Sequence, residues 1–94
     1  MAPTQIYPND SEETAKHVRR RQDGCMEFNA EAVEITLLDR RGHAIWRTQP
    51  AAPGQAMSWN GLDEYGMPVE PGAYTCKIRY PDKVAVYVPF VFMK

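Results

Sequence analysis

Residues 59–74 constrain the fold of this chain more than any other stretch, because they combine turn-forming residues with large aromatic side chains. Asn60-Gly61 tolerates the positive φ that a tight turn after a strand requires. Asp63 and Gly66 bound a four-residue segment with the acidic start and glycine end of a type I turn. Trp59, directly before the first turn, is expected to be a core residue. Such closely spaced turns predict short β-strands and exclude a long helix in this region.

A further turn precedes a strongly patterned strand. Pro71-Gly72 favours a type II turn, in which proline fixes φ and glycine supplies the positive φ that follows. From Ala73 to Tyr80 every even-numbered residue is apolar, as expected for a half-buried strand. Tyr74 stands at the start of this strand, where a β-sandwich places a tyrosine whose hydroxyl group bonds to upstream backbone. The sequence therefore predicts an antiparallel β-sandwich with Tyr74 at its corner.

The rest of the chain adds further short strands and no convincing helix, which gives about seven strands in total. Residues 15–21 are compatible with strand or coil, and a hairpin at Asp23-Gly24 would make them an edge strand. Asp39 and Gly42 predict a bulged hairpin loop. Pro89 lacks an N–H group, so its side of the last strand is expected to face an edge or a bulge. The other expected strands are 25–28, 33–38, 43–48, 55–59 and 84–92, and in the last one the even-numbered residues form a core-facing row.

A chain of 94 residues is expected to form one domain. Residues 1–14 are polar and proline-rich and predict a flexible lead-in with a brief edge pairing at Ile6-Tyr7, so the single sandwich domain is assigned to 15–94. The net charge of −1 provides no field that would attract nucleic acid, and no apolar run is long enough for membrane insertion. As part of a longer chain the domain would be extracytoplasmic (periplasmic, cell-surface or secreted), and as a complete chain it would be cytoplasmic.

The two cysteines allow two interpretations. Cys25 and Cys76 are either two small thiols, buried or half-buried, or the two halves of a disulfide. The order Cys25, Trp46, Cys76 follows the Cys…Trp…Cys order of immunoglobulin domains. Against a bridge, Cys25 has the opposite parity to its apolar neighbours Met26 and Phe28, which are expected to point inward.

Two segments together resemble a known family. Ile35 to Trp46 resembles its apolar strand, Asp-x-x-Gly turn and returning strand, and residues 59–74 resemble its Trp-Asp-Gly…Asp-x-x-Gly…Gly-x-Tyr signature. The family is the immunoglobulin-like domain of the flagellar hook-capping protein, with relatives in gliding-motility and secretion-sorting C-terminal domains; the Pro-Gly-x-Tyr part is also similar to fibronectin type III domains. The resemblance implies a bacterial structural module. Its signature residues in this chain are Trp59, Asn60, Gly61, Asp63, Gly66, Pro71, Gly72 and Tyr74.

Catalysis and metal binding find little support in the sequence. Ser11, Ser58, His17 and His43 form no nucleophile–base motif, so we expect no enzyme and no catalytic residues. Oxygen atoms of Asn60, Asp63 and Glu64 share one loop, but turn chemistry explains these residues, and we predict no metal and no cofactor. Arg19-Arg20-Arg21 could contact phosphate, yet a solvated edge strand accounts for it equally well, so no nucleic-acid partner is expected.

The function predicted from these features is a non-enzymatic structural or assembly module that mediates protein–protein contacts in a bacterial flagellar, surface or secreted protein. The alternative is a carbohydrate-binding or accessory module of a secreted enzyme, in which Trp46 would be the ligand platform. The partner is therefore expected to be protein, with carbohydrate as the alternative. A glycan array with the Trp46→Ala variant distinguishes the two hypotheses.

Overall fold

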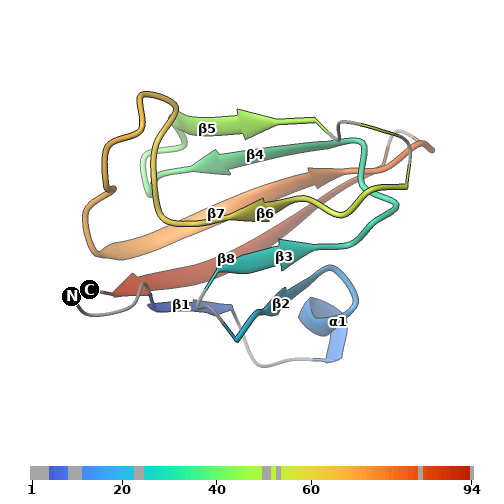
Figure 1. Ribbon diagram of the computed structural model, residues 1–94, viewed down its shortest axis with the longest axis horizontal. Coiled ribbons are helices and arrows are strands. Elements are labelled where there is room, and N and C mark those ends of the chain that lie inside the picture. The colour runs from blue at the N-terminus through green and yellow to red at the C-terminus, as the bar shows by residue number, and fades with distance from the viewer. Residues whose placement is uncertain are drawn as a thin grey trace.

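The computed structural model describes residues 5–8, 12–22, 25–49, 52, 54–82 and 84–93, with backbone alone for 5–8. Within these residues the chain forms eight β-strands and one helical turn (Figure 1). The elements are β1 (Gln5–Pro8), α1 (Glu12–Ala15), β2 (Val18–Arg20), β3 (Met26–Phe28), β4 (Glu34–Leu38), β5 (Ala44–Thr48), β6 (Ser58–Trp59), β7 (Gly72–Arg79) and β8 (Ala85–Met93). The predicted all-β class is confirmed.

The strands form two antiparallel sheets that face each other as the layers of a sandwich (Figure 1). The larger sheet has five strands in the order β1-β8-β7-β4-β5, and the smaller has three in the order β2-β3-β6. The longest pairing joins β7 to β8 over eight residue pairs, from Gly72 opposite Phe92 to Arg79 opposite Ala85. The other three strands of the larger sheet lie on either side of this long hairpin.

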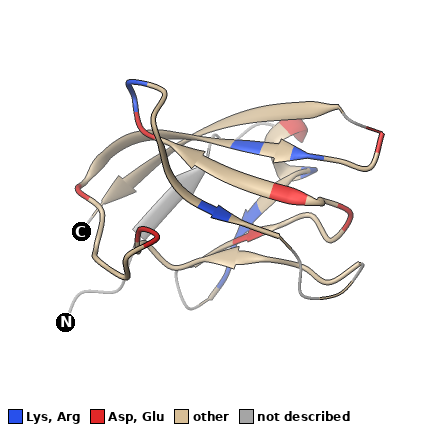
Figure 2. Ribbon diagram, turned by 90° about the horizontal axis from the view of Figure 1, so that it is seen from above, with Lys and Arg blue, Asp and Glu red and all other residues tan. Residues whose placement is uncertain are grey.

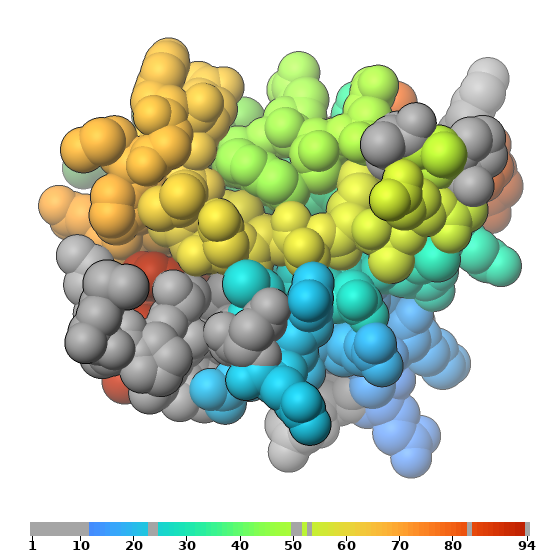
Figure 3. All heavy atoms as spheres, in the orientation of Figure 1, coloured from blue at the N-terminus to red at the C-terminus, as the bar shows by residue number. Residues whose placement is uncertain are grey.

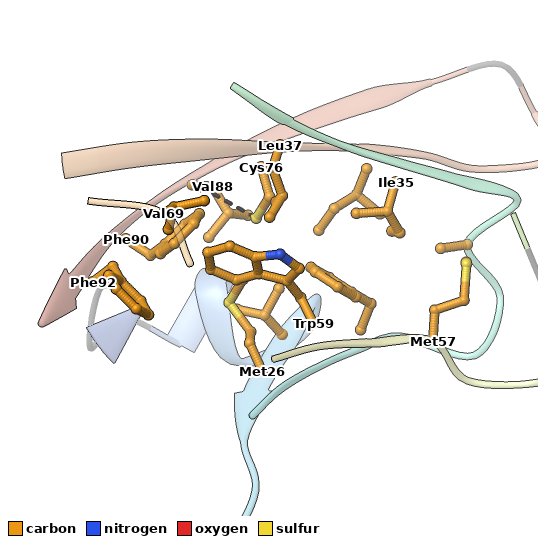
Figure 4. Close-up of a cluster of buried hydrophobic side chains, with 14 residues drawn as sticks. Met26, Ile35, Leu37, Met57, Trp59, Val69, Cys76, Val88, Phe90 and Phe92 are labelled. Atoms are coloured by element: carbon orange, nitrogen blue, oxygen red, sulfur yellow. Dashed lines mark hydrogen bonds between the residues drawn. The ribbon is translucent and has the colours of Figure 1, made fainter. Parts of the chain in front are cut away.

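The core fills the space between the sheets, and strand alternation decides which side chains enter it. Trp59, which is 1% exposed, comes from the smaller sheet and packs edge-on against Phe90 of the larger sheet, with ring centroids 5.5 Å apart. Figure 4 shows Trp59 at the centre of this cluster. The other members are Val18, Met26, Phe28, Ala32, Ile35, Leu37, Met57, Val69, Cys76, Ile78, Val88 and Phe92.

The even-numbered row predicted for the last strand is confirmed at its buried end and wrong at its start. Val88, Phe90 and Phe92 are buried and Val86 is half-buried, but Val84 is 52% exposed. The reason is that β8 begins only at Ala85, so Val84 still belongs to the turn after β7. The alternation holds only where the strand is paired.

Part of the expected lead-in belongs to the sandwich. The predicted edge pairing near Ile6 is confirmed, because β1 pairs antiparallel with β8 and places Ile6 opposite Phe92. A single helical turn, α1, follows at residues 12–15, where no helix was expected, and its Thr14 is buried. Backbone bonds from Lys16 N–H to the Glu13 carbonyl and from His17 N–H to the Thr14 carbonyl close this turn. β1 and the first residues of α1 thus precede residue 15, where the sandwich domain was expected to begin.

Three predicted features of the strands agree with the structure, and one predicted strand was too long. β2 pairs with β3 and forms an edge of the smaller sheet, although the turn residues 23–24 of this hairpin lie outside the described residues. β4 pairs with β5 with a register shift at Leu37/Leu38, as a bulged hairpin requires. The β1 register reaches Phe90 and stops before Pro89, so Pro89 lies beyond the β1–β8 pairing. The strand expected over 55–59 is shorter, because only Ser58–Trp59 pairs with β3.

Candidate interaction surface

Two loops of the same construction lie at one end of the sandwich, and the first joins β4 to β5. In this loop Asp39 Oδ1 accepts hydrogen bonds from the N–H groups of Arg41 and His43, both at 2.9 Å. Gly42 donates to the Asp39 carbonyl at 2.9 Å and has a φ of 85°, which a side chain would disfavour. These bonds, above all the one from His43 N–H, hold the pKa of the Asp39 carboxyl below its usual value.

The second loop, Asp63–Met67, repeats this pattern. Asp63 Oδ1 accepts from the N–H groups of Tyr65 and Met67 at 2.9 Å, and Gly66, with a φ of 79°, donates to the Asp63 carbonyl at 3.0 Å. Asp63 N–H bonds to the Met67 carbonyl at 2.8 Å and closes the loop. The predicted Asp-x-x-Gly turns are both confirmed. We call Asp63–Met67 the acidic loop, because it also contains Glu64.

Trp59 anchors the start of the acidic loop from the core. Its indole N–H donates to the Leu62 carbonyl at 2.7 Å, while Asn60 Oδ1 accepts from Leu62 N–H at 3.3 Å. Gly61 has the expected positive φ, 93°, and its carbonyl accepts from Val69 N–H at 3.0 Å. Sequence reasoning assigned Trp59 to the core and missed this hydrogen bond, which makes the residue an anchor of the loop as well.

The predicted tyrosine corner is present. Tyr74 Oη donates to the carbonyl of Glu70, four residues upstream, and the Tyr74 ring stacks on Phe90 with centroids 5.7 Å apart. Burial, followed by the nearby Glu70 carboxylate, raises the Tyr74 pKa. The expected type II turn at Pro71-Gly72 needs correction: φ of Gly72 is positive but reaches 152°, far from the value near +80° of that turn, because Gly72 is already the first residue of β7.

The signature residues thus build the acidic loop and the tyrosine corner, with Trp59 bonding to the loop from the core, and other side chains form the exposed surface. Tyr65 is 81% exposed and Met67 is 61% exposed, both on the acidic loop. A hydrogen bond with the Glu64 carboxylate raises the Tyr65 pKa above its ordinary value. In Figure 3 the atoms of this part of the chain, in orange, project at the upper left.

Trp46 lies in a less favourable position for a ligand platform than the sequence suggested. It is half-buried on β5, opposite Leu37, and packs against the core cluster. A sugar-stacking platform needs a flat aromatic face open to solvent, whereas part of the Trp46 surface already contacts the protein interior.

An exposed apolar stripe runs along β8 on the outer face of the five-stranded sheet. Tyr87, Val91 and Met93 are 58%, 45% and 48% exposed, and Pro89 between them is also exposed. Sequence reasoning missed this stripe because it followed only the even-numbered residues. The signal was available: residues 84–93 contain no charged residue, whereas a strand with one solvated face normally alternates with polar residues.

Charged residues occupy the neighbouring part of the same outer face. Strand pairing places Lys77 beside Tyr87, and it places Arg47 and Lys77 on either side of Thr36. Arg79 lies 3.5 Å from the Glu34 carboxylate. In Figure 2 the strands of this sheet carry blue (Lys, Arg) and red (Asp, Glu) segments, whereas the strand arrow near the C mark is tan, which marks uncharged residues. The outer face is therefore apolar towards the end of β8 and basic towards its beginning.

Several other titratable groups lie outside the two loops. No group of three or more His, Cys, Asp or Glu side chains there could hold a metal ion. His17 Nδ1 lies 2.6 Å from Tyr80 Oη and its Nε2 lies 3.5 Å from Glu13, whereas Ser58 is exposed on β6. On edge strand β2, Arg19 forms an ion pair with Glu27 at 2.6 Å.

Both cysteines are thiols, so of the two interpretations the unbridged one is confirmed. Cys76 is buried, and its thiol donates to the Val88 carbonyl at 3.3 Å. Burial raises the pKa of Cys76 to about 12. Cys25 is half-buried, as its opposite parity to Met26 indicated.

No family model, no curated protein and no solved structure matches this chain. The resemblance to the hook-capping immunoglobulin-like domain therefore rests on the sequence motifs alone. Across the described part of the chain, no helix is long and apolar enough to cross a membrane.

Proposed function

We propose that this chain is a non-enzymatic structural or assembly module that makes protein–protein contacts, of the immunoglobulin- or fibronectin III-like type used in bacterial flagellar, surface and secreted proteins. The observation that carries the proposal is the exposed stripe of Tyr87, Val91 and Met93 along one strand. Neighbouring apolar side chains on a sheet face cost solvation free energy when left in water, and contiguous exposed patches mark interaction sites.

The construction of the domain supports the same role. Its signature residues hold the acidic loop and the tyrosine corner, and Asp39 holds the loop between β4 and β5 by the same bonding pattern. Loops whose backbone is already fixed by hydrogen bonds need little further ordering when they bind a partner. Partner contacts on such a body come from sheet faces, sheet edges and end loops.

Site-specific photo-crosslinking tests the proposal. A photoreactive phenylalanine analogue replaces Tyr87 on the outer face, and in a matched variant it replaces Ser58, which is exposed on the smaller sheet. In cells of the native host we expect a discrete protein adduct from position 87 and none from position 58. Adding Val91→Glu should remove the adduct, because a carboxylate in the apolar stripe would be desolvated by the partner.

Two results would contradict the proposal. One is the absence of any adduct from position 87 that depends on Val91. The other is strong binding on a glycan array that Trp46→Ala abolishes, which would establish the carbohydrate-binding alternative.

A further inference from the structure

The outer face has a shallow hollow with a basic side chain at its border. Ala73, Thr75, Pro89 and Val91 line a shallow depression over β7 and β8, and Arg40 from the first Asp-x-x-Gly loop borders it. Lys77 lies one row further along the same face, next to Tyr87. Within the described part of the chain neither Lys77 nor Arg40 forms an ion pair with a carboxylate; Arg40 is exposed and Lys77 is half-buried.

The acidic loop carries the complementary set of groups. Tyr65 and Met67 present apolar surface at the end of the sandwich, and Asp63 and Glu64 precede them in the chain. The loop is held closed by the Asp63 N–H bond to the Met67 carbonyl, so it keeps its shape without a partner. One compact segment therefore presents the exposed Glu64 carboxylate and two large apolar side chains together, while the Asp63 carboxylate holds the loop.

Charge decides between the two ways in which two copies could use these surfaces. A symmetric contact of outer face against outer face would bring Lys77, Arg47 and Arg40 of one copy towards the same cations of the other. Like charges so placed are unfavourable and oppose that arrangement. A contact of the acidic loop with the outer face pairs carboxylates with cations and apolar side chains with apolar side chains.

We propose that the acidic loop of one copy docks on the outer face of a second copy of this chain. Tyr65 and Met67 cover the hollow lined by Pro89 and Val91, and Glu64 approaches Lys77. Such a heterologous contact leaves one loop and one face unused, so it extends into an open chain of copies unless the rotation closes a ring. This inference rests on the proposed function and names the partner of the same outer face.

The contact is weak for a pair of separate molecules. A five-residue loop buries far less than the roughly 800 Å² per partner of a standard stable interface. Its strength depends on ion pairs at the surface, so association falls as salt rises. Copies held close together by a scaffold would bind more strongly, since tethering raises the effective concentration of each loop.

Sedimentation velocity of the purified chain, from about 20 μM to about 1 mM at low salt, is the test. We expect the weight-average sedimentation coefficient to rise with concentration. Glu64→Lys and Lys77→Glu should each weaken association by about tenfold or more, because each replaces an attraction with a repulsion. Lys16→Glu, the same charge change as Lys77→Glu at an exposed site between α1 and β2, should leave it unchanged. Thermal unfolding confirms that each variant is folded.

The decisive step is to mix the two variants. Glu64→Lys and Lys77→Glu chains should associate with each other, because the new lysine of one loop meets the new glutamate of the other face. The inference is overturned if the wild type shows no association up to the highest concentration. It is also overturned if the single changes do not weaken association, or if mixing the two variants does not restore association. A Val91-dependent photo-adduct to a different protein, together with a monomeric wild type, would overturn the second copy as partner and leave the proposed function standing.

Discussion

Replacing Trp59 with phenylalanine tests the central packing argument of this fold. The change keeps an aromatic ring in the core and removes the indole N–H, which donates to the Leu62 carbonyl at 2.7 Å. Loss of that hydrogen bond costs about 1 kcal/mol. The smaller ring also removes buried atoms at 1% exposure, and about two methylene-sized groups at ~0.8 kcal/mol each add about 1.5 kcal/mol or more.

The sum predicts that the free energy of unfolding falls by about 2–4 kcal/mol. For a domain of this size the loss corresponds to a decrease in Tm of roughly 10–25 °C. Urea unfolding followed by circular dichroism measures the change, and the m-value should remain the same because the native body stays compact.

Trp46→Phe is the matched control, because it makes the same chemical change at the half-buried tryptophan of β5. It should cost less than about 1 kcal/mol. Equal losses for the two variants would refute the view that Trp59 both fills the centre of the core and anchors the acidic loop.

Three other changes test individual features. Gly66→Ala should destabilise by about 1–2 kcal/mol through its positive φ alone, since a Cβ there meets open space, and an unchanged urea midpoint would contradict this. Iodoacetamide at pH 8 should modify Cys25 and leave Cys76 unreacted until the chain unfolds, because burial raises the pKa of Cys76 to about 12; peptide mapping by mass spectrometry would reveal the reverse. The folded pKa of Asp39 lies below its unfolded value of 3.8, so its contribution to stability is present above pH 3.8 and is lost as the pH falls through the lower, folded value. Asp39→Asn should therefore flatten the acid limb of the stability curve, and a parallel shift of the whole curve would argue against this assignment.

The features that the sequence predicted well are those governed by local chemistry. Asp39 and Asp63 each cap a loop that ends in a positive-φ glycine, and the bonding pattern is short-range in both cases. Alternation of apolar residues likewise located the inward face of β7, because a strand buried on one face leaves a period of two. Tyr74 could be assigned because its partner, Glu70, is only four residues upstream.

The features that could not be predicted depend on what a strand lies beside. The exact start of β8 follows from its pairing with β7, and pairing decided that Val84 is exposed. The strand β1 exists because β8 offers it an edge, which the polar composition of residues 1–14 does not reveal. Gly72 has an extended positive φ and not the turn value, since it already pairs with Phe92.

The outer face shows a different kind of omission. Both faces of β8 are apolar, and the sequence pattern was used only to identify the face that enters the core. Val91 and Tyr87 alternate with the buried Phe90, and the sequence pattern does not show whether these odd-numbered side chains are covered or exposed. The sequence assigned the even-numbered residues to the core, and the three-dimensional structure added that the odd-numbered side chains Tyr87, Val91 and Met93 remain exposed.

The antiparallel pairing of β1 with β8 also determines how the domain responds to mechanical load. Gln5 lies directly opposite Met93, so tension applied between these two residues pulls the strands apart sideways. Backbone hydrogen bonds of an antiparallel pair run across the strands and would be stretched one after another, beginning at this end. Such a geometry peels open at low force, so a pull across this pair would detach β1 while the β7–β8 hairpin remains intact.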